Sequence, residues 1–140
     1  MNGPRDRAWL LASLPHQGAM NLLEAVVSWD EARIEARATN HRDTANPLRR
    51  GAMLPAAAGI EYGAQAAAAH GALVGSAGAG MIASVRGVRF HVDRLDDAGD
   101  VLDVHAEQLG GGAGGVLYRF DVASGGRLLV EGRVTVAFSR

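Results

Sequence analysis

The sequence has no cysteine, few aromatic residues and almost no net charge, and each of these absences narrows the possible functions. Without cysteine there are neither disulfides nor thiolate metal ligands, which agrees with the cytoplasmic localisation that we expect. A net charge of −1 attracts neither nucleic acid nor an anionic membrane, so neither is expected as a partner. No apolar run is long enough for a membrane span, and the run near the N-terminus is too short for a signal peptide.

The length of 140 residues is typical of one domain, and we expect a single domain over residues 1–140. Aromatic residues make up only 5% of the chain, so the core is expected to consist of valine, leucine and isoleucine. Glycine is abundant instead, with 19 residues, and its lack of a side chain lets backbone segments approach one another closely.

The segment that organises the chain is residues 55–73, with the sequence PAAAGIEYGAQAAAAHGAL. Alanine is the best helix former, and a helix that is apolar on nearly every side belongs in an interior. Glu61, Gln65 and His70 argue against a membrane interior, where each would be costly. We therefore predict a buried helix with Pro55 in its first turn. Desolvation is expected to raise the pKa of Glu61.

The rest of the chain shows the alternation of polar and apolar residues that is typical of strands with one wet face. Such runs occur at residues 22–29, 32–39, 81–92, 101–109, 116–122 and 127–138. We expect a short helix or turn at residues 7–14, a β-bulge at Gly87 and a mobile hairpin loop at residues 110–115. Tight turns between alternating strands indicate an antiparallel sheet. The predicted fold class is α+β, with about six strands wrapped around one helix.

Five histidines are candidates for acid–base chemistry. No two of them have the spacing of metal ligands, so no metal site is expected. His41 is expected in a solvated loop, and His70 near the end of the helix. His91 and His105 lie among polar neighbours in predicted strands and are expected to face solvent.

Three segments together resemble the β-hydroxyacyl-acyl-carrier-protein dehydratases, which have the hotdog fold. They are LPHQGAMNLLEAVVSW, PAAAGIEYGAQAAAAHGAL and MIASVRGVRFHVDRLDDAGDVLDVHAEQL, which span residues 14–109 in the order of that family. The helix is most similar to the branch of aryl-polyene and related pigment pathways, which favours IEY.AQA.AAH. The resemblance implies a hotdog dimer, in which the two central helices lie side by side and the sheets join. It also implies sites between subunits, with the acid from one and the base from the other.

The resemblance implies that the protein removes water from a 3-hydroxyacyl thioester to give the trans-2-enoyl thioester, in fatty-acid or polyene biosynthesis. The substrate would be carried on the phosphopantetheine of acyl carrier protein, so no cofactor of its own is expected. Elimination needs an acid, a base and a donor to the enolate-like oxygen. Glu61 is the candidate acid, unless it simply pairs with an arginine such as Arg86 or Arg89.

Several residues are candidates for holding the substrate. The N–H groups of Gly59 and Ile60, at the start of the predicted helix, are expected to be unpaired and to stabilise the enolate-like oxygen. Gln65, one turn after Glu61, is expected to orient the carboxylate or the substrate, unless it is a satisfied polar residue of the core. Asn46, in the loop shortly before the helix, is a further candidate for substrate binding.

The sequence departs from the housekeeping members of the family, which carry GHFPG with a catalytic histidine before the helix. Here residues 45–55 read ANPLRRGAMLP, with no histidine. His16 is therefore the candidate base, with a structural hydrogen bond at the dimer seam as the alternative. A second hotdog protein could also supply the missing histidine, so both a homodimer and a heterodimer are considered.

The loop before the helix carries two arginines, Arg49 and Arg50. They are candidates for contact with the phosphopantetheine phosphate or with the acidic surface of the carrier protein, the alternative being an ordinary exposed loop. Two further functions stay open. A hotdog thioesterase would use the helix carboxylate without a histidine base, and an acyl-binding partner subunit would have no catalytic activity.

Overall fold

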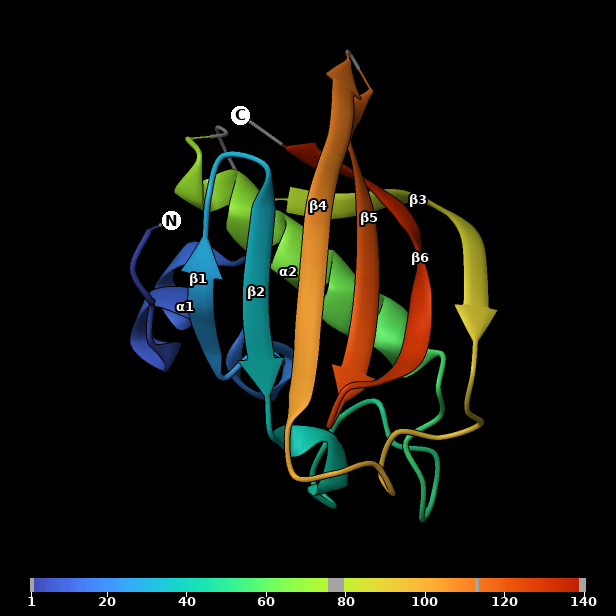
Figure 1. The fold of residues 1–140 in the computed structure, drawn as a ribbon. Helices are drawn as coiled ribbons and strands as arrows, with labels where there is room; N and C mark the ends of the chain where they lie inside the picture. Colours follow the sequence, from blue (N-terminus) through green and yellow to red (C-terminus); the bar gives the residue numbers. More distant parts are fainter. Residues whose placement is uncertain (1, 76–79, 113, 139–140) are drawn as a thin grey trace.

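The computed structural model describes residues 2–75, 80–112 and 114–138. A six-stranded antiparallel sheet curves around the long helix α2 (Ala58–Leu73), as Figure 1 shows. The strands are β1 (Ala25–Trp29), β2 (Arg33–Ala38), β3 (Gly80–Phe90), β4 (Leu102–Gly112), β5 (Gly115–Ser124) and β6 (Arg127–Phe138), in the spatial order β1-β2-β4-β5-β6-β3. A short helix, α1 (Arg7–Ser13), and two 3-10 turns, η1 (Gly18–Met20) and η2 (Asn40–Arg42), precede α2. The predicted α+β hotdog fold is confirmed.

Helix α2 is buried on nearly every side, as predicted, but it begins three residues later than expected. Pro55 lies outside the helix, in a bridge to Arg94, and the N–H of Ala56 donates to the carbonyl of Asp93 at 3.0 Å. These bonds to the β3–β4 connection keep residues 55 and 56 in a non-helical conformation. Over the described residues, neither helix has the length and hydropathy needed to cross a membrane.

Helix α2 lies close to the sheet because it has glycine at the positions that contact the strands. A Cβ atom on Gly63 would lie 2.3 Å from the Phe120 ring of β5, and one on Gly59 would lie 2.9 Å from a methyl group of Val130 in β6. Neither position has room for a methyl group unless its neighbour moves. The glycines of α2 are therefore a packing requirement at the contact with the central strands.

His70 joins the last turn of α2 to the β1–β2 turn and to strand β5, and it confirms the prediction of a residue packed near the helix end. Its Nε2 lies 2.8 Å from the carbonyl oxygen of Asp30, and its Nδ1 lies 2.7 Å from the hydroxyl of Tyr118. A carbonyl only accepts, so Nε2 carries the hydrogen and Nδ1 accepts from Tyr118. Burial lowers the pKa of His70, which keeps the ring in this neutral, fully bonded form.

Two predictions about the strands had different outcomes. The bulge at Gly87 is confirmed, because the pairing of β3 with β6 shifts register between Arg86 and Arg89 and Gly87 has a φ of 58°. The hairpin predicted at residues 110–115 is present, but its loop is shorter than predicted, since β4 runs to Gly112 and β5 begins at Gly115; residue 113 lies outside the described residues. The strand pairing uses backbone groups that glycine also has, and Gly110 and Gly112 pair with Leu117 and Gly115.

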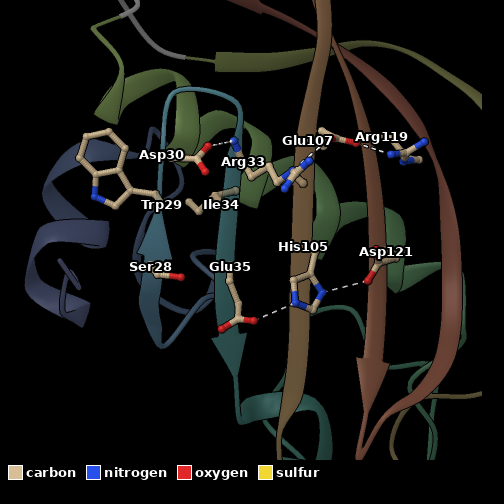
Figure 2. Close-up of a pocket in the computed structure, with 11 residues that line it drawn as sticks. Ser28, Trp29, Asp30, Arg33, Ile34, Glu35, His105, Glu107, Arg119 and Asp121 are labelled. Carbon is tan, nitrogen blue, oxygen red and sulfur yellow. Dashed lines mark hydrogen bonds and ion pairs between the residues drawn. The ribbon is translucent and has the colours of Figure 1, made fainter. Parts of the chain in front are cut away.

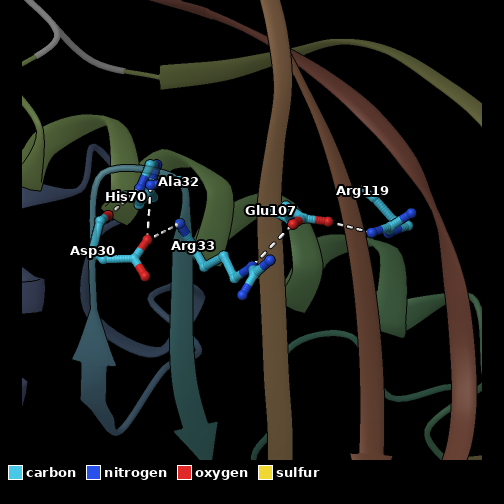
Figure 3. A network of polar contacts seen from close by, with 6 residues as sticks. All are labelled: Asp30, Ala32, Arg33, His70, Glu107 and Arg119. Carbon is cyan, nitrogen blue, oxygen red and sulfur yellow. Dashed lines mark hydrogen bonds and ion pairs between the residues drawn. The ribbon is translucent and has the colours of Figure 1, made fainter. Parts of the chain in front are cut away.

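The outer face of the sheet, turned away from α2, carries charged side chains that bond across strands. His105 of β4 lies between Glu35 of β2 and Asp121 of β5, 3.0 Å from each carboxylate (Figure 2). Two residues further along β4, Glu107 lies between Arg33 of β2 and Arg119 of β5 (Figure 3). His105 is thus partly exposed, as predicted, and the hydrogen bond with Asp121 followed by that with Glu35 raises its pKa to about 9.

We expect Gly63→Ala to lower the free energy of unfolding by about 1–3 kcal/mol, the usual cost of overpacking a core. The new methyl group would collide with Phe120. Urea unfolding followed by circular dichroism measures the change. Gly110→Ala is the control, since a Cβ there meets nothing within 4 Å. Equal stability of the two variants would contradict the close packing of α2.

We expect His105→Gln to destabilise the protein at neutral pH but not at high pH. The folded state holds the His105 proton more tightly than the unfolded chain, whose pKa is near 6.5. The stabilisation is therefore complete below that value and is lost as the pH rises through about 9. Urea unfolding of both proteins across this range measures the difference, and a difference that did not shrink with rising pH would contradict the assignment.

Candidate active site

His16 and Glu61 meet on the inner side of the sheet. Nε2 of His16 lies 3.3 Å from Oε1 of Glu61, and the two side chains are 23% and 28% exposed. Glu61 stands in the first turn of α2, and His16 comes from the segment between α1 and β1. The structure thus brings the predicted base and acid together within one chain. The alternative pairing of Glu61 with Arg86 or Arg89 is not seen.

Gln65 fastens the segment that carries His16 to the helix that carries Glu61. Its side chain is fully buried, its Oε1 accepts from the N–H of Leu22 at 2.8 Å, and its Nε2 donates to the carbonyl of Met20 at 2.8 Å. Both polar ends of the amide are used in this clamp. Because Gln65 lies one turn after Glu61, the clamp holds the distance between the two candidate residues.

Two residues that the sequence analysis did not single out, Arg7 and Asn21, complete this support. Asn21 is fully buried, and its Nδ2 donates to the carbonyls of Leu10 at 2.9 Å and His16 at 3.4 Å. Arg7 donates to the carbonyls of Asn21 at 2.6 Å and Leu23 at 2.5 Å. In the sequence, the feature that could have indicated this support is a single asparagine, Asn21, at the start of an otherwise apolar run.

The pKa of Glu61 is lowered, so the prediction of a raised value was wrong. A hydrogen bond from His16 is the largest cause, and it outweighs the desolvation that would raise the pKa. The charge of His16 and a hydrogen bond from Gln65 act in the same lowering direction. Desolvation is incomplete because Glu61 is only partly covered in the single chain. In this state Glu61 is a carboxylate that accepts from His16.

A pocket of about 400 Å³ adjoins the pair. Its remaining walls are apolar or small and come from α2, from the edge strand β3, from β6 and from the residue before His16: Pro15, Ala64, Gly80, Met81, Ile82 and Val136. An apolar cavity with one acid and one base at its wall suits a substrate with an acyl chain and a single reacting group.

A second hollow, of about 430 Å³, lies on the outer face of the sheet (Figure 2). It is lined by the charged residues described above, together with Trp29 and Ile34. Its histidine and its carboxylates already bond one another across the strands. These groups are held in a structural network, so the smaller pocket at Glu61 is the better candidate for chemistry.

The N–H groups of Gly59 and Ile60 are not free, so this prediction was wrong. Gly59 donates to the carbonyl of Ala56 at 2.9 Å, and Ile60 donates to the carbonyl of Ala57 at 3.1 Å. The turn that leads into α2 therefore uses both groups. Neither residue lines the pocket at Glu61.

The loop before α2 is held by its own bonds. Asn46 is buried, and its side chain donates to the hydroxyl of Tyr62 at 3.1 Å and accepts from the N–H of Leu48 at 2.9 Å. It does not line the pocket at Glu61. His41 was predicted to be solvated and is instead buried, 2.6 Å from the carbonyl oxygen of Gly99. Arg49 is partly exposed and Arg50 exposed, on the same loop.

Comparisons with known proteins identify the family and the fold of the chain. The sequence model of the ApeP-like family, described as ApeP dehydratase, matches residues 10–139. A chain of the dehydratase heterocomplex ApeI:P from Xenorhabdus doucetiae has a similar structure, with a TM-score of 0.80 and 26% identity over 91% of this chain and 89% of that one. No match was found among curated protein sequences.

Two more distant structures share the fold alone. A mutant thioesterase PA1618 from Pseudomonas aeruginosa has a TM-score of 0.68 and 15% identity, covering 95% of this chain and 93% of that one. The PaaI protein of the E. coli phenylacetic acid degradation operon has a TM-score of 0.61 and 16% identity, covering 79% of each chain.

We expect His16→Ala to raise the pKa of Glu61. The substitution removes the hydrogen bond that lowers this pKa most and leaves the desolvation that raises it. Carbon-detected NMR titration of the glutamate carboxyl groups measures the shift, with Glu31, exposed in the β1–β2 turn, as the internal control. A Glu61 pKa that did not move would show that the contact with His16 is absent in solution.

Proposed function

Because the chain belongs to the ApeP-like dehydratase family, we propose that it removes water from a 3-hydroxyacyl thioester with His16 and Glu61 as its reacting pair. The acyl group is carried on acyl carrier protein, in fatty-acid or polyene biosynthesis. The observation that carries this proposal is the 3.3 Å contact of the two side chains at the wall of an apolar pocket. Elimination takes a proton from one carbon and a hydroxyl from the next, so acid and base must lie close together.

The reaction needs a neutral histidine and a protonated carboxyl group. In the single chain the hydrogen bond from His16 lowers the pKa of Glu61 and favours its carboxylate form, since the pair is only partly covered. Burial under a partner subunit and an acyl chain disfavours the charged carboxylate, and so favours the protonated form of Glu61. His16 then takes the α-proton of the substrate, and Glu61 gives its proton to the leaving hydroxyl, which departs as water. Proton transfer from His16 back to Glu61 restores the pair.

A partner subunit is part of this proposal because strand β3 leaves apolar side chains uncovered at the edge of the sheet. Met81 is 66% exposed and Phe90 49%, and Ile82 and Val85 are also exposed. A long apolar edge strand invites pairing with another chain. Met81 and Ile82 also line the pocket at Glu61, so a subunit seated on β3 would close it.

We infer that the partner is a second hotdog dehydratase subunit. The similar chain from Xenorhabdus doucetiae belongs to a heterocomplex. The present chain lacks the histidine that the housekeeping enzymes carry before the helix. A different subunit would supply that histidine in a second site, whereas a homodimer would depend on His16 in both.

A thioesterase is the second candidate function, favoured by the lowered pKa of Glu61. A carboxylate at neutral pH is the form that activates water or attacks a thioester carbonyl. The products separate the two reactions, because a dehydratase gives an enoyl thioester and a thioesterase gives a free acid and a thiol.

We expect Glu61→Gln and His16→Ala each to lower kcat by about 100-fold or more, the usual contribution of a general acid or base. The assay follows enoyl-thioester formation from a 3-hydroxyacyl carrier substrate, by the chain alone and together with a second hotdog subunit. Glu31→Gln is the matched control, since Glu31 lies exposed in the turn between β1 and β2. Release of free acid would favour the thioesterase, and carrier binding without turnover would favour a non-catalytic acyl-binding subunit.

A further inference from the structure

Three arginines lie side by side across neighbouring strands of the sheet. The strand registers place Arg119 of β5 opposite Arg133 of β6, and Arg133 opposite Arg86 of β3. All three are exposed. We call Arg86, Arg119 and Arg133 the arginine row.

Within the described part of the chain, a carboxylate neutralises only Arg119, at one end of the row. Arg119 bonds Glu107, which also holds Arg33 (Figure 3). Among the described residues, Arg86 and Arg133 have no hydrogen bond or ion pair through their side chains. Like charges directly opposite each other destabilise a sheet, so the row is not explained by stability. It is better explained by an anionic partner.

The neighbouring positions restrict the kind of partner. Asp121 and Glu131, which pair with each other, lie two residues along β5 and β6 from Arg119 and Arg133. Two residues along a strand are about 7 Å, so this acidic pair lies directly beside the arginine row. These two carboxylates are already bonded to His105 and His91, so the positive charge left without a partner among the described residues is confined to a narrow strip rather than spread over a wide area. A protein surface with one narrow acidic strip would meet only the row.

We propose that the arginine row docks the acidic surface of the acyl carrier protein. This inference rests on the proposed function, because it names the partner that delivers the substrate. Charge complementarity of this kind speeds association and fixes the orientation of the two proteins. Two arginines without carboxylate partners are free to bind carboxylates of the carrier in a bidentate way.

The position of the row agrees with delivery to the pocket. Arg86 and Arg133 stand on β3 and β6, the two strands that also contribute Ile82 and Val136 to the pocket at Glu61. A carrier on the row would therefore sit on the outer side of the two strands whose inner side lines the pocket. Of the two loop arginines, Arg49 is less suited, since it already donates to the carbonyl of Ala52 at 2.6 Å.

The test is the double substitution Arg86→Glu with Arg133→Glu, studied in the complex with the partner subunit. We expect KM for a 3-hydroxyacyl carrier substrate to rise at least tenfold, and its dependence on salt to weaken. Turnover of a short pantetheine thioester, which needs no docking, should stay unchanged. Arg86→Gln with Arg133→Gln should give an intermediate effect and guards against misfolding of the reversed variant.

Two controls locate the effect. Arg37→Glu changes an exposed arginine on β2, and Arg50→Glu tests the loop before α2; neither should alter KM for the carrier substrate. An unchanged KM in the double variant, or a loss only in Arg50→Glu, would overturn the inference. If neither substrate is turned over, the proposed function fails, and anisotropy of a labelled carrier protein still tests the row directly.

Discussion

Helix α2 can lie close to the sheet because it carries glycine and alanine where larger side chains would hold it away. Its contact with Phe120 at Gly63 leaves no space for even one methyl group. This close packing fixes the height and rotation of the helix. Glu61 therefore faces the pocket beside β3, while Gln65 reaches the segment before β1. A displaced helix would move both residues away from His16.

Water around the site decides what the His16–Glu61 pair can do. In the single chain each side chain is about a quarter exposed, and the hydrogen bond from His16 keeps the pKa of Glu61 low. Covering the pair would favour the protonated form of Glu61. In the proposed dehydratase, association with another subunit and acid–base chemistry would thus be linked by desolvation. The exposed apolar side chains of β3 are the surface proposed for that association.

The two faces of the sheet have different roles, although each strand contributes to both. Inward residues form the core against α2 and the wall of the pocket. Outward residues form charge networks, in which His105 and Glu107 are each held between two opposite charges. The arginine row continues the charged positions to the edge strand β3. Within the described residues, its members Arg86 and Arg133 have no carboxylate partner. Alternation along a strand thus places the pocket wall on the inner face and the charged side chains on the outer face.

The sequence by itself determined the hotdog architecture, the buried helix and its one carboxylate, because these follow from periodicity and composition that are local in the chain. It also placed His16 and Glu61 among the candidates. Only the tertiary structure decided that Gly59 and Ile60 are bonded, that His41 is buried and that the pKa of Glu61 falls. The hydrogen bonds that Arg7, Asn21 and Gln65 make around the His16 segment could likewise not be predicted from sequence patterns. Hydrogen-bond partners and desolvation depend on residues far apart in the sequence, and only folding brings those residues together.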